Sequence, residues 1–133
     1  MPNTELVRRA HEALNNGDLD ALVALCEADF RLDMSDRVLN PAVYEGEDGI
    51  RRFYAEVTEV WETFTWRPVE LHDLDDLIVV VLHASGKGRG SGLELDRKSA
   101  MVWRVANDRL VALTFYRDPE DAFTAAESGR LSM

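Results

Sequence analysis

The stretch that decides the fold is 47-EDGIRRFYAEVTEVW-61. Its apolar side chains recur at the i, i+3, i+4 spacing of a helix with one buried face, over more than three turns; they are Ile50, Phe53, Tyr54, Val57, Val60 and Trp61. The polar residues Arg51, Arg52, Glu56 and Glu59 fall on the opposite face. This pattern predicts a long amphipathic helix whose apolar stripe must be covered by another element.

After this helix the apolar spacing changes to two, which is typical of β-strands. Four strands are predicted, at Phe64 to Leu71, Leu77 to Gly88, Leu93 to Val105 and Leu110 to Arg117. The segments between them are short and rich in Gly, Asn and Asp, so the strands should pair antiparallel. The alternating glycines from Gly86 to Gly92 leave one strand face bare, which lets a sheet bend or another group approach closely.

The part of the chain before the long helix predicts a helical hairpin and one short strand. Leu6, Val7, Ala10, Ala13 and Leu14 have helical spacing, and Gly17 is a plausible stop. Asp18 resembles the N-cap of a second helix with Leu19, Leu22, Val23 and Cys26 on one face. Phe30 to Ser35 alternates as a strand with Phe30, Leu32 and Met34 buried, and Asp36 to Gly46 is predicted to be a loop.

This order of elements, ending in a short helix that begins at Asp118-Pro119, predicts an α+β domain. A curved antiparallel sheet should wrap around the three helices of the N-terminal half. The result is a cone with one open end, where pockets tend to form.

Composition narrows the class of protein. The chain has 133 residues, of which 46% are hydrophobic and 30% charged, so a single domain over 1–133 is expected. A net charge of −10 disfavours nucleic acid and anionic membranes as partners. The start of the chain lacks the apolar run of a signal peptide, and Cys26 has no second cysteine to pair with, so the cytoplasm is the expected location.

Several local patterns, taken in order, resemble the SnoaL-like, ketosteroid-isomerase-like branch of the nuclear transport factor 2-like superfamily. The matching segments are 13-ALNNGDLDAL-22, 44-YEG-46 followed by 49-GIRRFY-54, the glycine-rich hairpin 86–92, 100-AMVW-103 and 115-FYRDPEDA-122. The resemblance covers about residues 4–127. It implies a cone-shaped pocket, no obligatory metal or organic cofactor, and homodimers that form through the outer sheet.

The same fold hosts isomerases, cyclases, hydrolases and binding proteins, so the resemblance does not name a reaction. The acid and base residues of ketosteroid isomerases would fall at about Met34, Ala10 and Met101, none of which titrates. An aspartate of limonene-epoxide hydrolases would fall at Phe115. Neither catalytic set is present.

His83, which ends the apolar run 77–82, is the candidate catalytic group, because an ordinary histidine pKa suits proton transfer near neutrality. A half-exposed structural histidine is the alternative. The candidate ligand-binding residues share an inward position on the predicted elements, with core packing as the competing interpretation; they are Leu32, Met34, Tyr54, Trp61, Met101, Trp103, Leu113, Phe115 and Arg117. Arg117 could instead pair with Asp118 or Glu120.

Other titratable residues are interpreted structurally. His72 is expected at the surface, His11 is expected to be exposed on the first helix, and Cys26 is expected to pack within the second helix. The three histidines are too scattered to predict a metal site.

Three hypotheses of function remain open. The chain could bind a small, largely apolar molecule in its cone. It could be a cofactor-independent isomerase, cyclase or hydrolase that uses His83, with or without Tyr54. It could also be a dimerisation module whose cone is filled by its own side chains.

Overall fold

The structure is a computed structural model that describes residues 1–38 and 40–128. Four helices and six strands follow one another along the described chain; they are α1 (Asn3–Asn16), α2 (Leu19–Ala24), β1 (Cys26–Asp33), β2 (Val43–Glu45), α3 (Gly46–Val60), β3 (Trp61–Leu74), β4 (Leu77–Gly88), β5 (Glu94–Ala106), β6 (Arg109–Tyr116) and α4 (Pro119–Ser128). The predicted α+β class, the long central helix and the four successive strands are confirmed.

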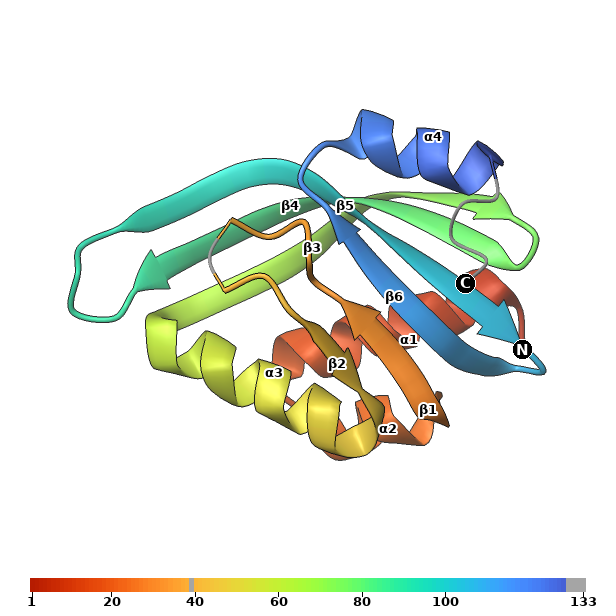
Figure 1. Cartoon of the computed structure of the whole chain (residues 1–133), viewed down its shortest axis with the longest axis horizontal. Helices are drawn as coiled ribbons and strands as arrows, with labels where there is room; N and C mark the ends of the chain where they lie inside the picture. Colours follow the sequence, from red (N-terminus) through yellow and green to blue (C-terminus); the bar gives the residue numbers. More distant parts are fainter. Residues whose placement is uncertain (39, 129–133) are drawn as a thin grey trace.

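All six strands form one curved, open sheet in the order β2-β1-β6-β5-β4-β3 (Figure 1). The pairs β3–β4, β4–β5 and β5–β6 are antiparallel, as their short turns require. Strand β1 joins β6 in parallel, and β2 pairs antiparallel with β1. The β4–β5 hairpin extends past the end of β6 (Figure 1).

Two predictions about the segment before α3 were wrong. The predicted loop from 36 to 46 contains β2, which places Tyr44 beside Leu32. Three residues are too few for a period of two to be visible in the sequence. Strand β1 begins at Cys26, so this residue is the first of a strand and not part of a helix. Its buried Sγ still contacts the helix, at 3.3 Å from the carbonyl oxygen of Leu22.

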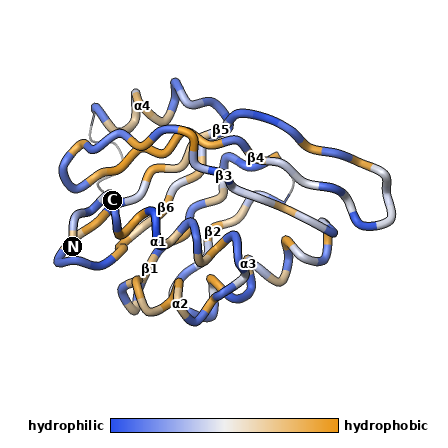
Figure 2. Tube along the Cα trace, turned by 180° about the vertical axis from the view of Figure 1, so that it is seen from behind, coloured by the Kyte–Doolittle hydropathy of each residue, from blue (hydrophilic) through white to orange (hydrophobic). Residues whose placement is uncertain are grey.

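Helices lie on both faces of the sheet (Figure 1). Helices α1, α2 and α3 cover the concave face and bury the main core, while α4 covers part of the opposite face. The second core places Ala122 and Ala126 of α4 against Val79 and Val102. In Figure 2 the hydrophobic stretches concentrate where the sheet meets the helices, and the tip of the β4–β5 hairpin is mostly hydrophilic.

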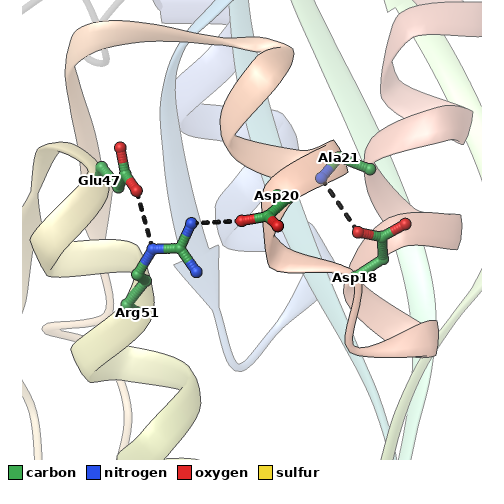
Figure 3. Close-up of polar contacts among 5 residues, drawn as sticks. All are labelled: Asp18, Asp20, Ala21, Glu47 and Arg51. Carbon is green, nitrogen blue, oxygen red and sulfur yellow. Dashed lines mark hydrogen bonds and ion pairs between the residues drawn. The ribbon is translucent and has the colours of Figure 1, made fainter.

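Local polar contacts fix how α2 and α3 meet. Gly17 adopts a left-handed φ of 70° at the end of α1, and the Asp18 side chain then accepts a hydrogen bond from the Ala21 N–H at 3.1 Å. Arg51 of α3 donates to Asp20 at 2.6 Å and to Glu47 at 2.9 Å (Figure 3). The start of α3 is therefore tied to the start of α2.

The free edge of the sheet at β3 is partly closed by a side chain. Asn15 donates from Nδ2 to the Trp66 carbonyl oxygen at 3.0 Å, and its Oδ1 accepts from the Trp66 N–H at 2.8 Å. The amide thus replaces a neighbouring strand and holds the middle of β3 against α1. Among the helices of residues 1–38 and 40–128, none combines the length and apolar character that a membrane crossing requires.

Candidate functional site

One apolar pocket lies at the wide end of the curved sheet. Its walls come from the second half of α3, from β3, β4 and β5, and from the chain around β1 and β6. The pocket volume is about 170 Å³. Most lining side chains are apolar; they include Met34, Phe53, Val57, Trp61, Phe64, Trp66 and Phe115.

Aromatic rings from β3 form the largest wall. The ring centroids of Trp61 and Phe64 are 5.3 Å apart, and those of Phe64 and Trp66 are 4.6 Å apart. Gly86 of β4 makes room for them, because a Cβ atom there would lie 2.7 Å from the Phe64 ring and 3.1 Å from the Trp61 ring. The bare glycine face predicted from the sequence therefore accommodates aromatic side chains.

A polar relay crosses the pocket wall between the β1–β2 connection and α3. Arg37 donates from Nη2 to the Tyr44 hydroxyl at 2.9 Å and to the Asn40 carbonyl oxygen at 2.5 Å. The Tyr44 hydroxyl in turn donates to Glu56 Oε1 at 2.5 Å. Burial, followed by the hydrogen bond to Glu56, raises the pKa of Tyr44, so this hydroxyl stays protonated.

The helical pattern predicted that Glu56 lies on the solvent-facing side of α3. This prediction was wrong in part, because the side chain also faces the pocket. It lines the pocket, and its other oxygen lies 3.9 Å from Arg52. Glu56 was assigned to the outer face because β2 was not predicted. This strand places Tyr44 against α3, where its hydroxyl contacts both Arg37 and Glu56.

The inner face of β5 adds a second polar group to the wall. Trp103, Met101, Ser99, Arg97 and Leu95 alternate along this face, and the last three line the pocket. Ser99 is fully buried, and its Oγ forms no hydrogen bond with any described residue. Arg97 lies across from Ala84 of β4, at the rim of the pocket.

Positive charge exceeds negative charge around this pocket. Among the described residues, three arginines line it (Arg37, Arg97 and Arg117), together with one carboxylate, that of Glu56. Asp36 lies behind Arg117, with 3.7 Å between its Oδ1 and the guanidinium Nη2, so the predicted pair with Asp118 or Glu120 was wrong. Arg37 and Arg97 form no ion pair within 4.0 Å in the described part of the chain.

Four of the nine predicted ligand-binding residues line this pocket: Met34, Trp61, Phe115 and Arg117. Contact with a ligand stays a prediction for them. Of the other five, four are buried elsewhere in the core; these are Leu32, Met101, Trp103 and Leu113. Tyr54 is also outside the pocket lining, because its hydroxyl reaches the turn at Gly17.

Helix α1 explains why the deep end of the cone is closed. His11, which was predicted to be exposed, is only 1% exposed and accepts a hydrogen bond at Nε2 from the Trp103 indole at 3.1 Å. Burial lowers the pKa of His11 to about 4, and the nearby Trp66 backbone offsets this lowering only in part. The Nδ1 atom makes no hydrogen bond of normal geometry within residues 1–38 and 40–128. The histidine and the indole fill the space expected for a ligand.

His83 does not reach the pocket. It lies between Leu82 and Ala84, whose side chains point to the concave face, so its own side chain points outward. There it is 39% exposed, accepts a hydrogen bond from Arg67 at 3.0 Å and contacts Asp96. The candidate catalytic group predicted from the sequence is therefore outside the pocket. The apolar run before it is buried on both faces of β4, so the sequence did not indicate which face is concave.

The remaining candidates have structural positions. His72 pairs with Glu70 at 2.8 Å and packs edge-on against Phe123 of α4, with 41% of its side chain exposed. Burial raises the pKa of the Cys26 thiol to about 12. Within the described ranges, no three His, Cys, Asp or Glu side chains come together as metal ligands.

Comparisons with known proteins agree with this architecture. The family model of the SnoaL-like domain matches residues 7–113. The fold is similar to that of an NTF2-like protein of unknown function from Burkholderia pseudomallei, at 25% identity and a TM-score of 0.77, over 93% of this chain and 97% of that one. None of the curated protein sequences matches the chain.

Two further solved structures share the fold at lower identity. TerC co-crystallised with polyporic acid is 17% identical, with a TM-score of 0.79 over 93% of this chain and 96% of that one. A protein of ketosteroid isomerase-like fold from Catenulispora acidiphila, in complex with trimethylamine, is also 17% identical, with a TM-score of 0.75 over 84% of each chain.

Proposed function

Because the chain belongs to the SnoaL-like domain family, we propose that it binds a small, largely apolar molecule in the pocket between α3 and the glycine-rich β4–β5 hairpin. The observation that supports this proposal is an apolar cavity of about 170 Å³ that its own aromatic side chains leave open. Cavities of comparable size (~150 Å³) admit a single aromatic ring. TerC, which has the same fold, was co-crystallised with polyporic acid.

The three tryptophans of the chain provide a direct test. Trp61 and Trp66 line the pocket, whereas Trp103 is buried beside His11, so their indole N–H signals in a ¹⁵N NMR spectrum report on different places. Titration with 2-naphthylmethanol should shift the Trp61 and Trp66 signals and leave the Trp103 signal in place.

A variant that fills the pocket supplies the control. Ala84 lines the cavity and is 4% exposed, so Ala84→Leu should lower the affinity at least tenfold. Ala55→Leu adds the same atoms to the exposed side of α3 and should bind as the wild type does. If one- and two-ring aromatic molecules at millimolar concentration shift the indole signal of neither Trp61 nor Trp66, the chain does not bind ligands in this pocket. The hypothesis of a dimerisation module without a ligand is then favoured.

Catalysis at Glu56 is the second candidate function, and it replaces the hypothesis that relied on His83. Glu56 is the carboxylate that lines the pocket, and the Tyr44 hydroxyl orients it at 2.5 Å. Such a carboxylate could remove a proton from a carbon next to a carbonyl group, becoming a carboxylic acid while the substrate becomes an enolate. In D₂O the wild type should speed deuterium exchange into 2-tetralone, and Glu56→Gln should not. Equal rates in wild type, variant and buffer would dismiss this activity.

Assembly and location are further proposals. We propose that two copies of 15.0 kDa form a homodimer through the outer face of the sheet, which α4 covers only in part. Light scattering should then give twice the mass of one chain; a mass of one chain at working concentration contradicts it. The single buried cysteine favours the cytoplasm as the location of this one-domain protein.

A further inference from the structure

We propose that the molecule bound in this pocket carries an anionic oxygen group, of which a carboxylate is the simplest form, and that Arg37, Arg97 and Ser99 receive it. This inference rests on the proposed function and adds the chemical class of the ligand. The ligand would place an aromatic or aliphatic body against Trp61 and Phe64 and its anionic end against β5.

Ser99 is the first observation. It is fully buried in the pocket wall, and its hydroxyl has no hydrogen-bond partner among the described residues. A buried hydroxyl without a partner is unfavourable, and native proteins leave few of them. The hydroxyl hydrogen can rotate about the Cβ–Oγ bond, so an acceptor oxygen that enters the pocket next to β5 would satisfy it.

Arg37 is the second observation. Its Nη2 donates hydrogen bonds to the Tyr44 hydroxyl and the Asn40 carbonyl oxygen. The central guanidinium carbon, Cζ, lies 5.6 Å from the centre of the Phe53 ring. Its Nε is buried and has no hydrogen-bond partner among the residues that the structure describes. The guanidinium is therefore held in one orientation, carries an unneutralised charge and keeps donors available, which suits recognition of a planar oxyanion.

The charges around the pocket support the same ligand class. The chain carries a net charge of −10, so a local excess of arginine runs against its overall composition. Glu56 is compensated by Arg52 at 3.9 Å and Asp36 by Arg117 at 3.7 Å, which leaves the charges of Arg37 and Arg97 to act on a ligand. A cationic ligand would meet repulsion at this rim.

The aromatic walls exclude a free inorganic anion as the preferred occupant. A phosphate or sulfate ion would lose its surrounding water on entering the pocket. The indole N–H groups of Trp61 and Trp66 are the only donors that the three aromatic side chains Trp61, Phe64 and Trp66 offer in return. An amphipathic organic acid satisfies both parts of the pocket, because its ring is removed from water while its charge stays at the rim.

The test compares two molecules of the same shape. The same ¹⁵N NMR titration is run at pH 7.5 with 2-naphthoate and with 2-naphthamide, following the indole signals of Trp61 and Trp66. We expect 2-naphthoate to bind at least tenfold more tightly than the amide. We expect this preference to fall when the salt concentration is raised from 50 to 500 mM, because exposed charges are screened.

Three variants assign the preference to residues. Arg97→Gln and Ser99→Ala should each weaken the binding of 2-naphthoate severalfold and leave that of the amide nearly unchanged. Arg67→Gln removes an exposed arginine from the outer face and should change neither. An unchanged Trp103 signal verifies that each variant is folded.

The outcomes separate this inference from the proposed function. If both molecules shift Trp61 and Trp66 with equal affinity, or if Arg97→Gln and Ser99→Ala both leave the acid's affinity unchanged, the anionic class is refuted while the binding pocket stands. If neither these two molecules nor the one-ring pair benzoate and benzamide shift the pocket tryptophans, the proposed function fails and this inference fails with it.

Discussion

Buried His11 should make the stability of this domain depend on pH well above the range where carboxylates titrate. In the folded chain its pKa is lowered from 6.5 to about 4 by burial, whereas the unfolded chain keeps the ordinary value. Between these two values the unfolded state binds more protons than the folded state. The free energy of unfolding must therefore decrease as the pH falls from 6.5 towards 4.

The size of the effect follows from the shift. A difference of one pKa unit corresponds to about 1.4 kcal/mol, so the full window is worth about 3 kcal/mol. At pH 5 the unfolded histidine is almost fully protonated, and about 2 kcal/mol of this should already be lost. Because the domain's whole stability is expected to be about 5–15 kcal/mol, such a loss is readily measured.

The assay is urea unfolding of the wild type and His11→Gln between pH 7.5 and pH 5. Glutamine does not titrate, and its amide oxygen can accept the hydrogen bond that Trp103 now donates to His11. The variant should therefore lose about 2 kcal/mol less than the wild type over this range. His72→Gln, which alters a histidine with 41% of its side chain exposed, is the matched control and should follow the wild type. Parallel pH profiles for wild type and His11→Gln would refute the reasoning.

Three further predictions concern packing. Gly86→Ala should lower the free energy of unfolding by about 1–3 kcal/mol in urea melts, because the new Cβ would overlap the Phe64 ring. The control Ser85→Ala, at an exposed neighbouring position, should change it by no more than about 0.5 kcal/mol. A Gly86→Ala variant as stable as the wild type would contradict close packing of the aromatic wall. Asn15→Ala should lower the free energy of unfolding by about 1–3 kcal/mol, because it removes the side chain that pairs with the N–H and the carbonyl of Trp66. The control Asn16→Ala, at an exposed position, should have little effect. Equal losses for the two variants would contradict the role of Asn15 at the sheet edge. Cys26, buried and with its pKa raised to about 12, should react with a thiol reagent only at the rate of unfolding, so fast labelling of the native chain would contradict its placement.

The elements with a long, unbroken pattern were predictable from the sequence. Helix α3 has more than three turns of helical apolar spacing, and β4 has a continuous apolar run enriched in β-branched residues, so their type did not depend on context. Strand β2 and the early start of β1 did depend on context. Their pairing with each other and with β6 stabilises segments too short or too irregular to show a period.

The candidate site was predicted in part, and the misses have two physical causes. Because α4 covers the outer face of β4, the run 77–82 is apolar throughout, and the face of His83 could not be assigned. His11 of α1 was predicted to be exposed, whereas it lies in the core and accepts a hydrogen bond from Trp103 of β5, a partner far away in the sequence. The position of Ser99 and Arg97, in contrast, could have been predicted. They are two and four residues before Met101 in the same strand, so they lie on the same face as Met101 and Trp103.

The position of the pocket bears on which chemistry this domain can carry out. By resemblance, the acid and base of ketosteroid isomerases would fall at about Met34, Ala10 and Met101; two of these, Ala10 and Met101, are fully buried in the apolar core beside the His11–Trp103 pair. Water and ligand are excluded from that depth, so a substrate cannot reach it without moving α1. Glu56, Arg37, Arg97 and Arg117, in contrast, line the pocket at the wide end. A reaction or binding event in this domain should therefore take place at the mouth of the cone, on the polar end of a molecule whose apolar body lies against the β3 aromatics.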